Sequence, residues 1–286
     1  MPNLSFFLPL VLQSAVVPFG VALALLAALR AGRLNRIASA FAIAGGFLAT
    51  YFLALHAQWS PMPKVALDWM PWIAAIGVVG ALSAERVARE GARLLVRLAL
   101  STAVCGAVVW PALAALGMQK AMLVAGIAGL VLGTAWSAMA RATARGAMPP
   151  LSLAVVAGGA GIALMLDSSQ SIGQLCGALA SVLGACVVFI FLPRERTAFS
   201  PAAAGTSVLL LGALLLNAHV YAGFPLSYLV LLVAGMMAGP VVAGMDKVWR
   251  RKGGVGSWAT AAVLTVMPVA ATVTLAVQAA AAYGGY

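Results

Sequence analysis

The feature that most constrains this chain is a succession of ten apolar segments, each separated from the next by a short polar loop. A helix needs about 20 apolar residues to cross the hydrocarbon core of a bilayer. The segments that meet this description are 5–29, 37–56, 70–84, 98–117, 121–140, 149–167, 171–192, 203–221, 225–245 and 257–281. They predict an all-α polytopic transmembrane bundle of about ten helices, a single integral membrane domain over 1–286 with no extramembrane domain.

The composition agrees with this prediction. The 286 residues are 64% hydrophobic and 8% charged, whereas a soluble domain is about 45–50% apolar and about 25% charged. The formal net charge is +11, which in a soluble protein would suggest a nucleic-acid partner. The apolar composition excludes a soluble, a disordered and a nucleic-acid-binding chain, so the charge needs another explanation.

The basic residues alternate between loops. Lys and Arg in the loops of a membrane protein gather on the cytoplasmic side. The odd-numbered loops hold 15 of the 17: Arg30, Arg33, Arg36, Arg86, Arg89, Arg93, Arg97, Arg141, Arg145, Arg194, Arg196, Lys247, Arg250, Arg251 and Lys252. The even-numbered loops hold only Lys64 and Lys120. We therefore expect the N-terminus and the C-terminus both outside, and the odd loops in the cytoplasm.

The uneven distribution of basic residues also indicates which molecules the protein contacts and in which membrane it lies. A basic cytoplasmic rim favours contact with the anionic headgroups of the lipid bilayer or with an acidic partner. Arg outnumbers Lys by 13 to 4 and Ala is abundant, which is typical of a GC-rich bacterial genome. The predicted location is therefore the bacterial inner (cytoplasmic) membrane, and no nucleic-acid partner is expected.

Two short similarities suggest an internal repeat. Residues 43–46 (IAGG) resemble 156–159 (VAGG), and 124–126 resemble 233–235, at offsets of 113 and 109. They fit a weak parallel repeat of 37–140 onto 149–245, although Ala and Gly are so common in this chain that chance coincidence is favoured over the repeat. Repeats of this kind occur in membrane transport folds.

Glycines recur four residues apart in three segments. Small residues at this spacing share one face of a helix and let two backbones approach closely. The pairs are Gly129 and Gly133, Gly173 and Gly177, and Gly235 and Gly239. They predict helix packing within the bundle, with a homodimer interface as the alternative.

A second set of residues are candidates for a hinge in a helix or for the lining of a solute path. A proline within a span removes a backbone hydrogen bond and kinks the helix. Gly239 adds freedom beside one of these prolines. Asp167 lies at an outer helix end, where capping of the next helix is the alternative role, and Asn217 is a polar residue within a span. The set is Pro18, Pro111, Gly239, Pro240, Pro268, Asp167 and Asn217.

The sequence contains no recognisable catalytic chemistry. No Asp, Glu, Lys or Arg lies near the middle of a predicted span, which argues against a proton-coupled antiporter, an ion pump and a voltage sensor. His56 and His219 fall near outer helix ends, where a solvated histidine is favoured over a haem or metal ligand. Cys105, Cys176 and Cys186 read as buried apolar residues. We expect no enzyme, no cofactor and no metal.

Two functions remain open. The first is a permease that passes a small neutral or anionic solute, or a lipid, by rocking about kinked helices. The second is a non-catalytic subunit that anchors or braces a larger membrane complex. The intramembrane prolines and hydroxyl groups favour the first, whereas short loops and Gly/Ala-rich packing faces favour the second.

Overall fold

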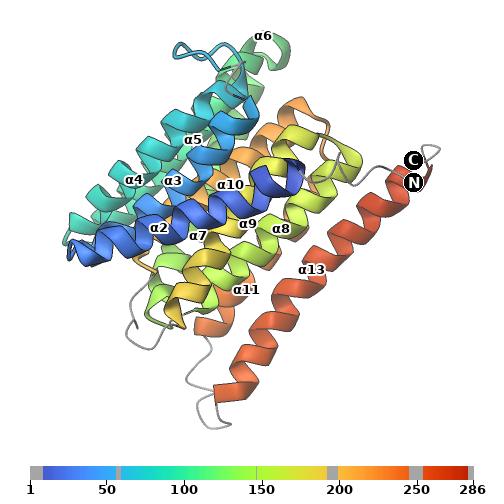
Figure 1. Ribbon diagram of the computed structural model, residues 1–286. Helices are drawn as coiled ribbons and strands as arrows, with labels where there is room; N and C mark the ends of the chain where they lie inside the picture. Colours follow the sequence, from blue (N-terminus) through green and yellow to red (C-terminus); the bar gives the residue numbers. More distant parts are fainter. Residues whose placement is uncertain (1–8, 56–58, 146, 192–198, 245–253, 283–286) are drawn as a thin grey trace.

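The computed structural model describes residues 9–55, 59–145, 147–191, 199–244 and 254–282, and these form helices with no strand (Figure 1). The long helices are α2 (Val17–Ala31), α3 (Asn35–Leu55), α4 (Met70–Arg86), α5 (Glu90–Val109), α7 (Met118–Ala142), α8 (Met148–Asp167), α9 (Gln170–Ile190), α10 (Pro201–Tyr221), α11 (Leu226–Gly244) and α13 (Gly254–Ala282). Short elements join them: η1 (Leu12–Val16), η3 (Ala66–Trp69), η4 (Trp110–Ala112), α6 (Leu113–Leu116) and η5 (Thr143–Arg145).

The prediction of an all-α polytopic bundle is confirmed. Within the described residues, nine helices are long and apolar enough to cross a membrane, and α11 supplies a shorter apolar stretch, Leu226–Val242. Each of the ten predicted segments coincides with one long helix. The chain is therefore a multi-pass helical membrane protein by fold.

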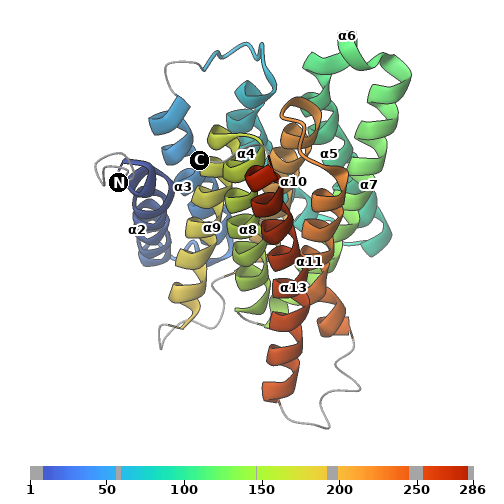
Figure 2. The same cartoon turned by 90° about the vertical axis from the view of Figure 1, so that its right-hand side faces the viewer.

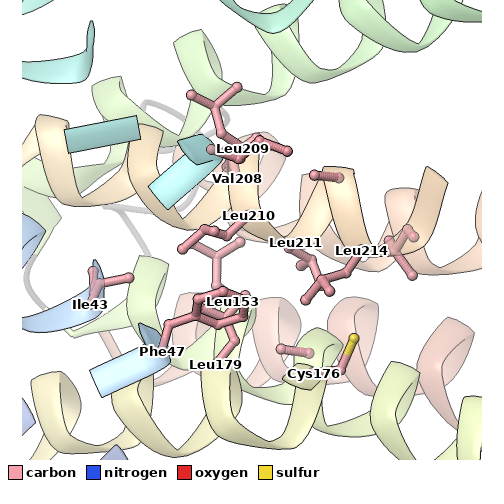
Figure 3. Close-up of a cluster of buried hydrophobic side chains, with 14 of the residues drawn as sticks. Ile43, Phe47, Leu153, Cys176, Leu179, Val208, Leu209, Leu210, Leu211 and Leu214 are labelled. Atoms are coloured by element: carbon pink, nitrogen blue, oxygen red, sulfur yellow. The ribbon is translucent and has the colours of Figure 1, made fainter. Parts of the chain in front are cut away.

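Helix α10 occupies the centre of the bundle. Every residue from Ala202 to Ala218 is buried, because α10 contacts α3, α4, α5, α7, α8 and α9. A helix that is apolar on all sides lies in a protein interior or in a membrane, and the neighbours of α10 place it in the interior of the bundle. Figure 3 shows Leu210 of α10 close to Leu153 of α8, with Phe47 of α3 on the far side of Leu153.

The outer helices present large apolar side chains to their surroundings. Leu123 and Ile127 of α7 and Met267 of α13 are each more than half exposed. On a water-soluble monomer, a surface made of such exposed apolar side chains would be an aggregation or binding surface. On a bundle of this length it is the surface that faces lipid.

The loops alternate between the two ends of the bundle, as the sequence predicts. Helix α2 begins and α13 ends toward the same end (Figure 2). Among the described residues, Arg33, Arg89 and Arg141 lie where the odd-numbered loops gather, and Lys64 and Lys120 lie at the opposite end. The basic residues of 194–196 and 247–252 lie outside the described residues. Which end faces the cytoplasm stays a prediction, and so does the repeat of 37–140 onto 149–245.

The start of α5 corrects one predicted boundary. The helix begins at Glu90, so Arg93 and Arg97 lie within it instead of in the loop before residue 98. Arg97 is 6% exposed, and it lies two turns into α5, opposite Glu85 in the last turn of α4. It is therefore near one end of the span Glu90–Leu116, and it does not contradict the prediction that no charged residue lies near the middle of a span.

Candidate functional site

Helix α7 has two faces that pack in opposite ways. On the side of α5, a Cβ added at Gly129 would lie 2.6 Å from the Cα of Thr102, and one at Gly133 would lie 3.0 Å from the Cα of Leu98. Real Cβ atoms are essentially never found as close as 2.6 Å, and a distance of 3.0 Å is tighter than nine in ten real contacts. The absence of a side chain at both positions therefore lets α5 and α7 approach closely. This side of α7 is closed.

The other side of α7 borders a cavity of about 310 Å³ between α7, α10 and α11. In Figure 2 the helices α7 and α11 stand next to each other on the flank that faces the viewer. Among the described residues, the lining is apolar with one exception, and most of its side chains are large. The lining residues are Leu123, Val124, Ile127, Ala128, Val131 and Leu132 of α7, Leu211, Gly212, Leu215, Leu216 and His219 of α10, and Leu226, Leu229, Val233 and Met236 of α11.

The cavity opens sideways, toward the membrane. Its floor is buried, since Leu211 is 0% and Leu132 is 5% exposed, whereas Leu123 and Ile127 at its rim are 62% and 56% exposed. Helices α10 and α11 make few contacts beyond the turn that joins them. Helix α11 packs against α13, α8 and α7 instead. The floor is therefore reached from the lipid-facing flank of the bundle.

His219 is the one polar side chain among the described residues that line the cavity, and it lies in the last turn of α10. Its Nδ1 is 2.7 Å from the carbonyl oxygen of Phe224. Because a carbonyl oxygen only accepts, Nδ1 carries the proton and donates it to this bond. When the ring is neutral, Nε2 keeps a lone pair that can accept a hydrogen bond.

The turn after α10 fixes the histidine in this place. Gly223 adopts φ +72°, a left-handed conformation that favours glycine. The N–H of Phe224 then donates to the carbonyl of Ala218, which satisfies a carbonyl at the helix end. Tyr221 donates its hydroxyl proton to the carbonyl of Val108 at 2.9 Å and ties the end of α10 to α5.

A partly buried ion pair lies beside the closed α5–α7 face, close to the last turn of α4. An Nη of Arg97 donates to Glu85 Oε1 at 2.6 Å, and the Arg97 Cζ lies 5.6 Å from the ring centroid of Trp136 on α7. The Nε1 of Trp136 and the Oγ of Ser101 are buried without a hydrogen-bond partner among the described residues. The pair links α4, α5 and α7.

Pro18 creates a polar junction between three helices. It follows the π-helical η1, where the Val17 N–H bonds to Leu12, and Pro18 itself has no N–H to give Ser14. The two carbonyls released in this way accept hydrogen bonds from neighbouring helices. Thr50 of α3 donates to Gln13 at 2.8 Å and Ser181 of α9 donates to Ser14 at 3.2 Å.

The other predicted prolines lie in different surroundings. Pro111 falls in η4, where α5 ends. Pro240 and Pro268 lie within α11 and α13, and the Pro268 ring faces the place of a side chain at Gly235, 3.4 Å from a Cβ built there. None of them lines the cavity.

The remaining glycine pairs lie at contacts between helices of one chain. A Cβ at Gly173 would lie 2.9 Å from the Gly161 carbonyl oxygen, whereas one at Gly177 would lie 3.6 Å from Ser14. A Cβ at Gly235 would be 3.2 Å from the Thr265 carbonyl oxygen, and one at Gly239 would be 3.2 Å from Ser152 Oγ. These glycines bring α8 to α9 and α11 to α13 and α8.

Other predicted residues lie away from the cavity. Asn217 is 2% exposed, and its Nδ2 has no partner among the described residues. Asp167 ends α8, but the cap of α9 is Ser169, whose Oγ accepts from the Ile172 N–H at 3.5 Å. The predicted capping role of Asp167 is therefore wrong. His56 lies outside the described residues.

Cysteine, histidine and carboxylate groups do not gather among the residues that the structure describes. The three cysteines are buried thiols, and within the described part of the chain no three His, Cys, Asp or Glu residues come together as metal ligands. The structure therefore leaves the cavity as the candidate site. Sequence reasoning missed it, together with Arg97, since a cavity depends on which helices become neighbours.

Comparison with known proteins does not assign the chain to a family. No family model matches the chain, and neither a curated protein nor a solved structure matches it. The class that the fold and the lipid-facing surface define is a multi-pass membrane protein with a lateral apolar cavity. Any narrower function has to be argued from that cavity.

Proposed function

We propose that this protein is a permease for lipids, which admits the apolar chain of a lipid from the bilayer into the cavity between α7, α10 and α11. The observation that carries the proposal is a 310 Å³ apolar cavity with a buried floor and a rim on the lipid-facing flank. In the described part of the chain a small polar solute would find only one polar side chain at this cavity, whereas an acyl chain matches the lining.

The energetics suit transport better than storage. Lipid tails are as apolar as leucine, so a chain that leaves the bilayer for the cavity gains little hydrophobic free energy. Binding then depends on shape and on the polar end of the ligand. Such weak and reversible binding is what a permease requires.

The packing around the cavity suggests how it would open. Helix α11 contacts α13 through Gly235, and Gly239 and Pro240 follow one turn later. Its contact with α10 is slight. In this proposal α11 and α13 rock together against α7 and α10, because the break at Pro240 removes a backbone bond that would resist bending.

Reconstitution into liposomes tests the proposal. Fluorescent lipid in the inner leaflet becomes accessible to a membrane-impermeant quencher only when it crosses the bilayer. We expect the protein to accelerate this crossing, and Ala128→Trp, which fills the cavity from α7, to return the rate to that of protein-free liposomes. The matched control is Leu130→Trp, because Leu130 is 56% exposed and outside the cavity lining.

Two outcomes would overturn the proposal. One is a wild-type rate equal to that of protein-free liposomes. The other is equal loss of activity in Ala128→Trp and Leu130→Trp, which would show that the cavity is not the path. Stoichiometric recovery of other membrane subunits with the protein from native membranes, together with no lipid transfer, would instead support the bracing-subunit hypothesis.

A further inference from the structure

We infer that the ligand of the cavity is a single-chain lipid phosphate, with its chain between α7 and α11 and its phosphate at Lys120, the end where α7 begins and α10 ends. This inference rests on the proposed function and adds the class of lipid. Three observations carry it: the volume of the cavity, the register of Lys120 on α7, and the free nitrogen of His219.

The volume selects one chain. An apolar protein cavity of about 150 Å³ holds one benzene, which has six carbons. On that scale, the 310 Å³ of this cavity holds about a dozen carbons. This matches most of one acyl chain, whereas the two chains of a diacyl lipid would need about twice the space.

The register of α7 places a cation above the cavity. Lys120 precedes Leu123, Val124 and Ile127 by three, four and seven residues, so all four share one face of the helix. Lys120 is exposed in the first turn of α7, and a long lysine side chain at a helix end extends toward the headgroups. A phosphate at that level meets an ammonium group directly above the apolar lining.

His219 completes the polar end. It lines the cavity one turn or less from the end of α10, the same end of the bundle as Lys120. With Nδ1 bound to Phe224, Nε2 of the neutral ring accepts a hydrogen bond. The free hydroxyl on the glycerol of a monoacyl phospholipid supplies such a donor, two carbons from the phosphate-bearing oxygen. Chain, hydroxyl and phosphate thus each have a counterpart.

Lipid binding to the purified protein, measured by native mass spectrometry in a neutral detergent, tests the inference. The probes are lysophosphatidylglycerol, lysophosphatidylcholine and diacyl phosphatidylglycerol with the same chain. We expect lysophosphatidylglycerol to bind most tightly. We expect Lys120→Gln to weaken it about fivefold, as loss of one basic residue near a phosphate does. The matched control is Lys64→Gln, which removes an exposed lysine at the same end but in the loop before η3.

The proposed hydrogen bond from the glycerol hydroxyl of the lipid to His219 Nε2 is tested with a separate lipid analogue. A 2-O-methyl analogue of lysophosphatidylglycerol cannot donate to Nε2, and we expect it to bind about fivefold more weakly to the wild type. In His219→Phe the analogue and the parent lipid should bind equally. Equal binding of both to the wild type would remove His219 from the site.

The outcomes separate this inference from the proposed function. Equal weakening by Lys120→Gln and Lys64→Gln, or tighter binding of the diacyl lipid, would overturn the single-chain phosphate while Ala128→Trp still abolished lipid transfer. If Ala128→Trp leaves both lipid binding and transfer unchanged, the proposed function fails and the inference falls with it.

Discussion

The two faces of α7 show opposite solutions to the packing of helices in a lipid environment. Toward α5, glycines at 129 and 133 bring the backbones together, and Trp136 lies under the Arg97 guanidinium. Toward α11, the same helix carries Leu123, Ile127 and other large side chains, and a cavity remains. One helix therefore has a closed face and an open face.

The difference follows from the size of the residues. Helices in a bilayer gain little from burying apolar surface against each other, so close packing of small residues holds them together. Where glycine faces the neighbour, the contact closes. Where leucine and isoleucine line the gap and α11 separates from α10, a cavity remains beside α7.

The largest expected effect lies at the ion pair on the closed face. Glu85→Gln leaves the buried Arg97 charge without a counterion, and we expect a loss of about 3 kcal/mol in the free energy of unfolding. Reversible unfolding in detergent micelles, followed by circular dichroism, measures it. Glu90→Gln is the control, because it removes an exposed carboxylate from the first turn of α5. Comparable losses in the two variants would show that the pair does not hold the closed face.

A single methyl group tests the close approach itself. Gly129→Ala forces a Cβ against the Thr102 backbone, and we expect it to lower the free energy of unfolding by about 1–3 kcal/mol. The matched substitution Gly126→Ala lies one turn away on α7, where an added Cβ meets no atom within 4 Å. It should be neutral or stabilise slightly, because alanine favours a helix over glycine. If Gly129→Ala is as stable as Gly126→Ala, the closed face does not depend on glycine.

The smallest effect on stability is expected on the open face. Ala128→Trp adds a large side chain where the cavity has room for it, and we expect the free energy of unfolding to fall by less than it does in Gly129→Ala. The same unfolding measurement applies. A loss larger than that of Gly129→Ala would mean that the open face has no room for a side chain, and so none for a lipid chain.

Much of the fold was predictable from the sequence, because a helix that crosses a bilayer needs a run of about 20 apolar residues. All ten runs become helices, but the start of α5 was misplaced since Arg93 and Arg97 were counted as loop. Arg97 is tolerated in the helix because Glu85 and Trp136 come from other helices, which a single run does not reveal.

The candidate site was less predictable for the same reason. The spacing of Gly129 and Gly133 indicates a contact but not its partner. Leu123, Ile127 and Leu132 look like any apolar face of a span, and only the divergence of α10 and α11 turns them into a cavity wall. The one available signal was His219, a polar residue at a helix end, which the sequence alone leaves as a solvated histidine.

The central claim is that a lipid chain enters the cavity, and photolabelling tests it most directly. A lipid with a diazirine near the end of one acyl chain would be irradiated with the protein in liposomes, and the labelled residues mapped by mass spectrometry. We predict label on Leu132 and Leu211, which form the buried floor at 5% and 0% exposure. Label confined to exposed residues such as Leu130 and Val266 would show that the chain stays outside, and would contradict the account.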